Sequence, residues 1–313
     1  VAAGGEFRLL SGNQIGALLA DFVLSHRALT PKSTMITTIV TGELGARVAQ
    51  SRGVTVLRTL TVFKYIGEKI TEFARSGERE FLFGYEESYG YLAGTHAQDK
   101  DAVVAAMLIC EMAAAAKSKG RTLIDELNGL YARFGYYLDA QDSHTLKGKD
   151  GAERIAAMMA RLRGGARFEG VSQTLDYAQG LDGLPRENVM KFLCADGSWF
   201  AVRPSGTEPK IKIYYSIKDT DETSAEAKLD TAAPKSAASS DCKGKEGSDH
   251  AQKDRDVSPS ARARGVRRPG PQLHRPALLQ LRFRRPAQVL HQVRGLHVRQ
   301  GHPGEAVREL RLR

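Results

Sequence analysis

Apolar runs and helical patterns alternate three times between residues 35 and 119, and this alternation constrains the fold more than any other feature of the chain. Short apolar runs predict strands, and longer stretches with apolar residues every three or four positions predict helices. The predicted elements follow one another as strand 35–40, helix 43–52, strand 54–57, helix 64–75, strand 80–84 and helix 99–119. This order predicts a parallel sheet flanked by helices, a doubly wound α/β/α domain over residues 31–135.

The segment before this domain is too short to close a core of its own. Residues 1–30 offer one extended piece at 6–10 and one helix, for which Asn13 is the predicted N-cap. We interpret them as the end of a preceding domain. After the long helix, Thr122 and Asp125 have the spacing of a capping box that opens another helix.

The pattern changes to a mixture of shorter elements after residue 135. The predicted order is strand 136–146, helix 151–162, then strands near 171–177, 189–193, 199–202 and 211–215, and a helix from 222. This mixture of short strands and helices predicts a smaller α+β domain over residues 136–230.

The net charge of +10 belongs to the C-terminal segment. Residues 257–313 hold 13 Arg, two Glu, no Lys and no Asp, a net charge of +11, so everything before them sums to −1. A nearly neutral body does not predict a nucleic-acid partner. The tail at 231–313 is expected to be disordered. Its Arg-rich part has two interpretations, an RNA-binding arm or a non-native C-terminus from an altered reading frame, and the absence of Lys favours the second.

Cysteine usage and hydropathy indicate a protein of the cytoplasm. Cys110, Cys194 and Cys242 lie far apart without paired spacing, which argues against disulfides and zinc. The longest apolar run, 102–116, contains Glu111 and is shorter than a membrane span, so no membrane partner is expected.

Two segments carry candidate chemistry, and the first follows the third predicted strand of the α/β domain. In FGYEESYGY, Glu86 can accept hydrogen bonds from two adjacent sugar hydroxyls, and Ser88 adds a donor and an acceptor. The alternative is an acidic surface turn. Lys100, in the following DKDAV, could face an anion at a helix start or simply pair with a neighbouring aspartate.

The second segment is RPSGTEPK, between the last two predicted strands. Hydroxyls, free amides around a glycine and a guanidinium can together surround a phosphate dianion. The residues concerned are Arg203, Ser205, Gly206 and Thr207. A bare hairpin turn is the alternative.

Together these segments resemble the sugar-binding and phosphate-binding loops of the alpha-D-phosphohexomutases, and the resemblance extends over residues 5–217. It implies that Glu86 and Ser88 contact sugar hydroxyls and that Lys100 is the active-site lysine beside the transferred phosphate. It also implies that the other phosphate is held by Arg203, Ser205, Gly206 and Thr207, with Lys210 as an additional candidate. Residues 1–30 would then be the remnant of the family's metal-binding domain.

A third loop of the family is altered here. TLTVFKYIG at 59–67 resembles a family loop that approaches the ligand with its backbone, and Thr61 would be its contact residue. Val62 stands where the family has glycine. Since a β-branched residue resists positive φ, we expect the contact made by this loop to be altered.

The resemblance also implies chemistry for which this chain has no motif. The family transfers a phosphoryl group through a phosphoserine, with Mg²⁺ held by three aspartates and glucose 1,6-bisphosphate as activator, and neither the serine loop nor the aspartate loop is found. We therefore expect a fragment of a mutase that interconverts hexose 1-phosphate and hexose 6-phosphate, inactive alone, with a phosphorylated hexose as its ligand. The alternatives are a non-catalytic phosphosugar-binding module and RNA binding through the Arg-rich tail.

Overall fold

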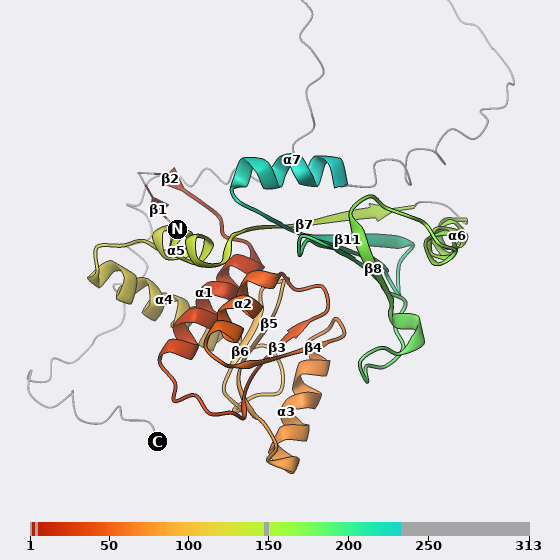
Figure 1. Ribbon diagram of the computed structural model, residues 1–313. Coiled ribbons are helices and arrows are strands. Elements are labelled where there is room, and N and C mark those ends of the chain that lie inside the picture. Colours follow the sequence, from red (N-terminus) through yellow and green to blue (C-terminus); the bar gives the residue numbers. More distant parts are fainter. Residues whose placement is uncertain (1, 4–5, 147–149, 233–313) are drawn as a thin grey trace, which may run out of the picture. The chain divides into compact units, whose positions relative to one another are not determined.

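The computed structural model describes residues 2–3, 6–146 and 150–232, in which two larger sheets form separate layers (Figure 1). A two-residue pair, β1 (Ala2–Ala3) and β2 (Glu6–Phe7), precedes them. The Arg-rich segment 257–313, and with it the RNA hypothesis, lies outside the described residues, as does the rest of the predicted tail from residue 233.

The first sheet confirms the predicted parallel arrangement and adds a strand. Its order is β4 (Thr55–Thr59), β3 (Ser33–Thr38), β5 (Glu80–Glu86) and β6 (Gly90–Ala93). The first three strands are parallel, and β6 runs antiparallel to β5. The segment expected to be an open loop after the third strand is therefore a tight β-hairpin, which the pattern of apolar residues did not predict.

Helices cover both faces of this sheet. Their bounds are α1 Gly12–Ser25, α2 Glu43–Ser51, α3 Lys64–Ser76, α4 Ala102–Ser118 and α5 Leu123–Phe134. Residues of α1, α2, α4 and α5 share one core with the sheet, and α3 packs on the other face through Ile66, Ile70 and Phe73. Among the described residues, no helix is both long enough and apolar enough to cross a bilayer.

Helix α1 was expected to belong to a preceding domain, but it packs within the domain of the first sheet. Leu18, Leu19 and Val23 are buried in the same core as Met35 of β3, so α1 is a component of the first sheet's domain. The helix also begins earlier than expected. Its N-cap is Ser11, which forms a reciprocal capping box with Gln14. The capping box predicted at the start of α5, between Thr122 and Asp125, is confirmed.

The second sheet has five antiparallel strands and confirms the predicted α+β arrangement. Its order is β7 (Tyr136–Thr145), β11 (Lys210–Asp219), β10 (Trp199–Pro204), β9 (Met190–Cys194) and β8 (Val171–Asp176). The helices are α6 (Gly151–Arg163), α7 (Glu222–Ala232) and the 3₁₀ turn Tyr177–Gln179. Phe200 and Val202 of β10 pack with Ile155 and Met159 of α6 on one face of the sheet.

The opposite face of the second sheet packs against the first domain, and we call this contact the seam. Because side chains alternate along a strand, Trp199 and Ala201 point away from Phe200 and join a core with Ile39 and Leu60. The Trp199 indole Nε1 donates to Glu43 Oε1 at 2.9 Å, so the seam is also fixed by a specific hydrogen bond.

Two buried charges lie at the seam. Lys191 Nζ donates to the Ile39 carbonyl oxygen at 2.7 Å and lies 3.8 Å from the Trp199 ring centroid. Burial lowers the pKa of Lys191 to about 7. Burial also raises the pKa of Asp139 to about 6, where the Asp139 carboxylate fills the space beside Gly42 at the start of α2. The position of the Asp139 carboxylate depends on the bare backbone of Gly42, because a Cβ there would clash with Asp139 Oδ2.

Candidate functional site

Glu86 ends β5 and is the buried acid of the hairpin. Only 8% of the residue is exposed, and burial raises the pKa of its carboxyl. The nearby Lys100 and a hydrogen bond with the exposed Ser88 partly oppose that rise. Glu86 is therefore held in place by the strand, with the Ser88 side chain beside it. The role of these two residues as a sugar-binding pair stays a prediction.

Gly90 explains how Glu86 and Lys100 come together. It lies opposite Glu86 in the hairpin register. A Cβ on Gly90 would lie 2.8 Å from Glu86 Cγ and 3.1 Å from Lys100 Cδ, so the two side chains pass over the bare glycine backbone. Glycine at this position permits an acid and a base to lie side by side.

Lys100 precedes the N-cap of α4 rather than lying inside the helix. The cap is Asp101, whose Oδ1 accepts from the backbone N–H groups of Val103 and Val104. The Lys100 ammonium is 3.2 Å from Asp99 Oδ1 and 5.7 Å from the Phe63 ring centroid. The local pair with Asp99 is thus formed, but both groups are exposed, and such pairs contribute little.

The Thr61 loop lies next to this cluster, between β4 and α3. Thr61 is 7% exposed, and its hydroxyl has no hydrogen-bond partner among the described residues. Val62 has φ +91° and is 53% exposed. The valine thus adopts the backbone conformation that favours glycine, although a β-branched side chain was expected to resist positive φ.

Val62 should therefore be strained, and we expect Val62→Gly to raise the free energy of unfolding by about 1 kcal/mol. Relief of a positive-φ valine is worth roughly 1–3 kcal/mol, against roughly 0.5–1 kcal/mol for the extra chain entropy of glycine. Denaturant unfolding measures the change. Gly53→Val is the reciprocal control, because Gly53 has φ +75° and open space around it, and it should be destabilising. A loss of stability in Val62→Gly would show that the valine is not strained.

The phosphate motif lies at the turn between β10 and β11. Ser205 and Thr207 line the turn, with their hydroxyl oxygens 3.5 Å apart, and the Ser205 N–H donates to the Lys210 carbonyl at 2.7 Å. Gly206 is exposed, and a Cβ on it would have no atom within 4 Å. Lys210 pairs with Glu208 at 2.7 Å, so its ammonium already has a neighbouring carboxylate.

Arg203 carries an unsatisfied group. Its Nε is buried and has no hydrogen-bond partner among the described residues, and the Glu187 carboxylate is 3.6 Å away, beyond hydrogen-bond distance. A buried N–H without a partner is costly, and an anionic ligand is one way to satisfy it.

Lys212 is a candidate that sequence reasoning missed. It lies directly opposite Arg203 in the β10–β11 register, on the seam side of the sheet. Two cations facing each other across a ladder do not stabilise a sheet. The alternation of Lys212 with Ile211 and Ile213 predicts a half-buried strand, and the same alternation places Lys212 on the face that carries Arg203.

The β5–β6 hairpin and the two cations Arg203 and Lys212 interact electrostatically across the seam. Burial raises the pKa of the Glu87 carboxyl, and the positive charges of Lys212 and Arg203 oppose that rise. The pKa of Tyr214 is raised mainly by burial, and it responds to Glu87, Arg203 and Glu86. The structure therefore brings the predicted sugar-binding and phosphate-binding residues within electrostatic reach of one another.

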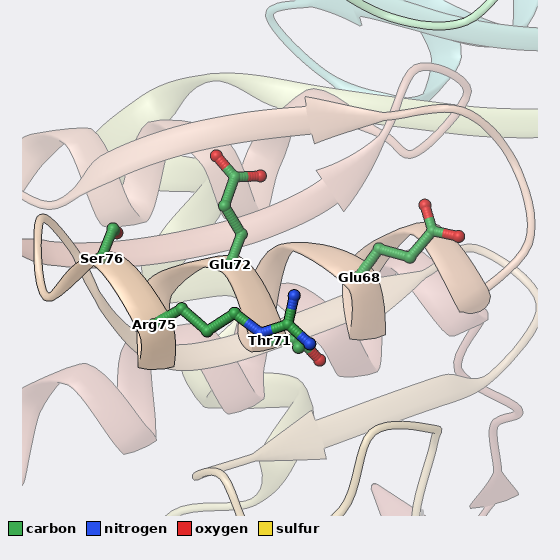
Figure 2. Close-up of a pocket in the computed structure, with 5 residues that line it drawn as sticks. All are labelled: Glu68, Thr71, Glu72, Arg75 and Ser76. Atoms are coloured by element: carbon green, nitrogen blue, oxygen red, sulfur yellow. The ribbon is translucent and has the colours of Figure 1, made fainter.

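A surface hollow of about 490 Å³ lies elsewhere, on the outer side of α3 (Figure 2). Its lining consists of Glu68, Thr71, Glu72, Arg75 and Ser76. None of the predicted site residues contributes to it, and we do not assign it to the candidate site.

The described ranges contain no group of three His, Cys, Asp or Glu side chains that could hold a metal ion. The residues present in these ranges therefore do not fit the Mg²⁺ that the resemblance implies.

Comparison with known proteins identifies both domains. Residues 11–134 match the phosphoglucomutase/phosphomannomutase alpha/beta/alpha domain III, and residues 147–232 match the C-terminal domain of the same proteins. The phosphoglucomutase of Staphylococcus haemolyticus is 38% identical over 228 residues, which are 68% of this chain and 41% of that protein. The Staphylococcus epidermidis phosphoglucomutase is 37% identical over 230 residues, 69% of this chain and 42% of that protein.

Solved structures show the same fold. The open form of the exocytosis-sensitive phosphoprotein pp63/parafusin, a phosphoglucomutase from Paramecium, aligns with a TM-score of 0.57 at 19% identity, over 75% of this chain and 42% of that one. A phosphoglucomutase/phosphomannomutase family protein from Burkholderia thailandensis aligns with a TM-score of 0.51 at 16% identity, over 74% of this chain and 43% of that one. The chain thus spans about two fifths of the length of the relatives it matches.

Proposed function

The chain belongs to the alpha-D-phosphohexomutase family, and on that premise we propose that it supplies the sugar-binding and phosphate-binding parts of an enzyme that interconverts hexose 1-phosphate and hexose 6-phosphate. Glucose phosphate is the expected hexose phosphate, as in the Staphylococcus proteins that are named phosphoglucomutases. A location in the cytoplasm is part of the proposal, supported by the free thiols of Cys110 and Cys194.

One observation carries the proposal: an acidic hairpin and a basic turn from two different domains influence each other across the seam. The charges of Arg203 and Lys212 act on Glu87, which is adjacent to Glu86. Carboxylates suit the hydroxyls of a sugar, and paired cations suit a phosphate. A ligand with hydroxyls at one end and a phosphate at the other matches this division of charge.

The sugar end is assigned to the first domain. Glu86 would accept hydrogen bonds from two neighbouring hydroxyls, and Ser88 would add one more contact. The loop of Thr61 would contribute its backbone and its unpartnered hydroxyl. Because Glu86 must be ionised to accept from both hydroxyls and burial raises its pKa, sugar binding should weaken as the pH falls through that raised pKa.

The phosphate end is assigned to the second domain. Arg203 would donate its unsatisfied Nε–H, and Ser205, Gly206 and Thr207 would donate from the exposed turn. Lys210 and Lys212 are the remaining cations, and of these Lys212 lies opposite Arg203 while Lys210 is engaged by Glu208.

Lys100 is the proposed catalytic residue, placed beside the transferred phosphate. Its neighbour Glu86 fixes one side of that position, across the bare backbone of Gly90. In the family, a phosphoserine, Mg²⁺ and glucose 1,6-bisphosphate complete the reaction. Because no sequence motif for the serine or aspartate loops is found, we propose that this chain binds the phosphosugar without turning it over.

Titration calorimetry of the full chain tests the proposal with three ligands: glucose 6-phosphate, glucose and inorganic phosphate. We expect glucose 6-phosphate to bind at least about tenfold more tightly than either part, because sugar and phosphate are held by different domains. Glu86→Gln should remove this advantage and leave phosphate binding intact. Glu68→Gln, on the α3 hollow, is the matched control.

Two outcomes would contradict the proposal. If glucose 6-phosphate bound no more tightly than inorganic phosphate, the sugar site would be refuted. If the chain with Mg²⁺ and glucose 1,6-bisphosphate gave mutase turnover well above background, the proposed inactivity of the chain alone would be wrong.

A further inference from the structure

The β5–β6 hairpin carries a second carboxylate, Glu87, to which the proposed function assigns no role. It directly follows Glu86, the last residue of β5. Successive side chains of an extended chain point to opposite sides. Glu86 accordingly lies beside Lys100, whereas the Glu87 carboxylate contacts Thr38 of β3. The two neighbouring carboxylates of the hairpin therefore have different surroundings.

The contact with Thr38 places Glu87 at the seam. Thr38 is fully buried, and its hydroxyl donates to Glu87 Oε2 at 3.5 Å. The next two residues of the chain, Ile39 and Val40, belong to the seam core together with Tyr214 of β11. The Glu87 carboxylate is thus fixed to the segment of the first domain that the second sheet covers.

Arg203 and Lys212, which we call the cation pair, approach the seam from the second domain. Lys212 and Tyr214 lie on the same side of β11 because side chains alternate along a strand, and Arg203 is opposite Lys212 in the register. Tyr214 is buried in the seam core, so the cation pair lies on the seam side of the sheet. Electrostatics agree with this placement, since both cations act on Glu87 and both Glu87 and Arg203 act on Tyr214.

Three other carboxylates face this cluster. The charge of Glu86 acts on Glu87, and the charge of Glu87 acts on Asp139, in both cases by repulsion. Glu187 lies 3.6 Å from Arg203 Nε, but its side chain is 29% exposed and can be stabilised by water. Glu87 is different, because burial and repulsion both oppose its ionised form, and the cation pair stabilises that form.

We propose that Glu87 is the internal counter-ion of the cation pair, and that a phosphate dianion replaces it in this role while Glu87 takes up one proton. The inference rests on the proposed function, since it takes Arg203 and Lys212 as phosphate ligands. The proton comes from solvent and binds a carboxylate oxygen of Glu87, and no bond of the phosphate changes. Glu87 is thus a positioning residue, which holds the cations in place until the phosphate arrives.

The sign of the pH dependence follows from the charges. In the free chain, the cation pair opposes the rise that burial causes in the pKa of Glu87. A bound dianion cancels that opposition and adds repulsion, so the pKa rises further and binding takes up a proton. Affinity should therefore fall by roughly tenfold per pH unit between the free and bound pKa values. A phosphate monoester loses its second proton near about pH 6, so the ligand itself contributes little to the change between pH 7 and 9.

Titration calorimetry of the full chain at pH 8 measures the coupling. Glucose 6-phosphate is titrated in two buffers of different ionisation enthalpy, and the difference in heat gives the protons taken up, which should be about one per chain. Inorganic sulfate is the second probe. It stays a dianion in this range and offers Glu86 no sugar hydroxyls, so any proton taken up with it belongs to the protein.

Glu87→Gln should abolish the proton uptake and make glucose 6-phosphate bind about tenfold more tightly at pH 8, because the internal competitor for the cations is gone. The affinity of this variant should no longer fall between pH 7 and 9. Glu187→Gln is the matched control: it removes the more exposed carboxylate near Arg203 and should leave the proton uptake unchanged.

An NMR titration of the side-chain carboxyl groups tests the counter-ion role without any ligand. Lys212→Met should raise the pKa of Glu87 in the free chain, because it removes one of the two charges that oppose the rise. Lys218→Met is the control. Lys218 lies on the same side of β11 but roughly 20 Å further along the strand, so its loss should not move the pKa of Glu87.

The contrary outcomes are distinct. Uptake that persists in Glu87→Gln would assign the proton to the ligand or to Lys191, and uptake that is absent from the unmodified chain would refute the coupling while upholding phosphate binding. A chain that binds neither glucose 6-phosphate nor sulfate would refute both the coupling and the proposed function. An unchanged pKa of Glu87 in Lys212→Met would refute the counter-ion role, whatever the chain binds.

Discussion

Arg203→Gln should weaken the binding of glucose 6-phosphate by roughly 10- to 100-fold. Hydrogen bonds to charged groups contribute about 1.5–3 kcal/mol, and about 1.4 kcal/mol corresponds to a factor of ten in affinity. The reason the effect should be at the upper end is structural. The Arg203 Nε is already buried and makes no hydrogen bond, so the phosphate supplies a hydrogen bond that the Glu187 carboxylate, 3.6 Å away, does not.

The comparison of ligands makes this prediction specific. Titration calorimetry should show a similar loss for inorganic phosphate and almost none for glucose, since Arg203 is assigned to the phosphate end alone. Arg163→Gln is the matched control: Arg163 belongs to the same domain but bonds to Asp176, with Nε 3.0 Å from Oδ2. Phosphate affinity within twofold of the unmodified chain would exclude Arg203 from the site.

Gly12→Ala should destabilise the chain by about 2–3 kcal/mol and disturb the sugar hairpin. A Cβ on Gly12 would lie 2.0 Å from the Glu87 carbonyl oxygen and 3.0 Å from the Tyr89 nitrogen. Both are backbone atoms of the hairpin turn, which cannot move aside as a flexible side chain can, and such overpacking costs about 1–3 kcal/mol or more. Tyr91 also donates to the Gly12 carbonyl at 2.9 Å, so the contact is fixed from both sides.

Denaturant unfolding measures the effect, and Gly129→Ala is the matched control. Gly129 lies inside α5 with no atom within 4 Å of a Cβ, so alanine there should stabilise the chain by up to about 1 kcal/mol through helix propensity. If Gly12→Ala were as stable to denaturant as Gly129→Ala, then α1 would not be in close contact with the hairpin backbone at Gly12. The hairpin would then have to be held by other contacts.

The order of strands and helices could be predicted because it rests on local periodicity. Alternating apolar positions in 211–215 and helical spacing in 64–75 appear in β11 and α3. These features depend on neighbours within a few residues.

The features that the sequence did not predict depend on contacts between segments that are distant in the chain. The membership of α1 is decided by its burial against β3 and β5, which a helical pattern alone does not specify. Gly90 of strand β6 passes close to Glu86 and Lys100, and the pattern of apolar residues does not specify this contact. Lys212 becomes a candidate only through its register with Arg203.

The buried charges of the seam could not be predicted from the sequence either. Lys191 follows Met190 in an ordinary strand pattern, and nothing nearby in the sequence indicates that its ammonium will reach the Ile39 carbonyl. The same holds for Asp139, since its burial depends on Gly42, almost a hundred residues earlier.

Strand β10 carries two residues of different roles, Trp199 and Arg203, four positions apart. Trp199, the single tryptophan of the chain, donates to Glu43 of the first domain, and Arg203 on the same side of the strand lies at the phosphate turn. At about 3.3 Å per residue, the two positions are separated by roughly 13 Å of backbone held in register by β9 and β11. The strand therefore sets a fixed backbone spacing between the Trp199 contact with the first domain and the Arg203 position at the phosphate turn.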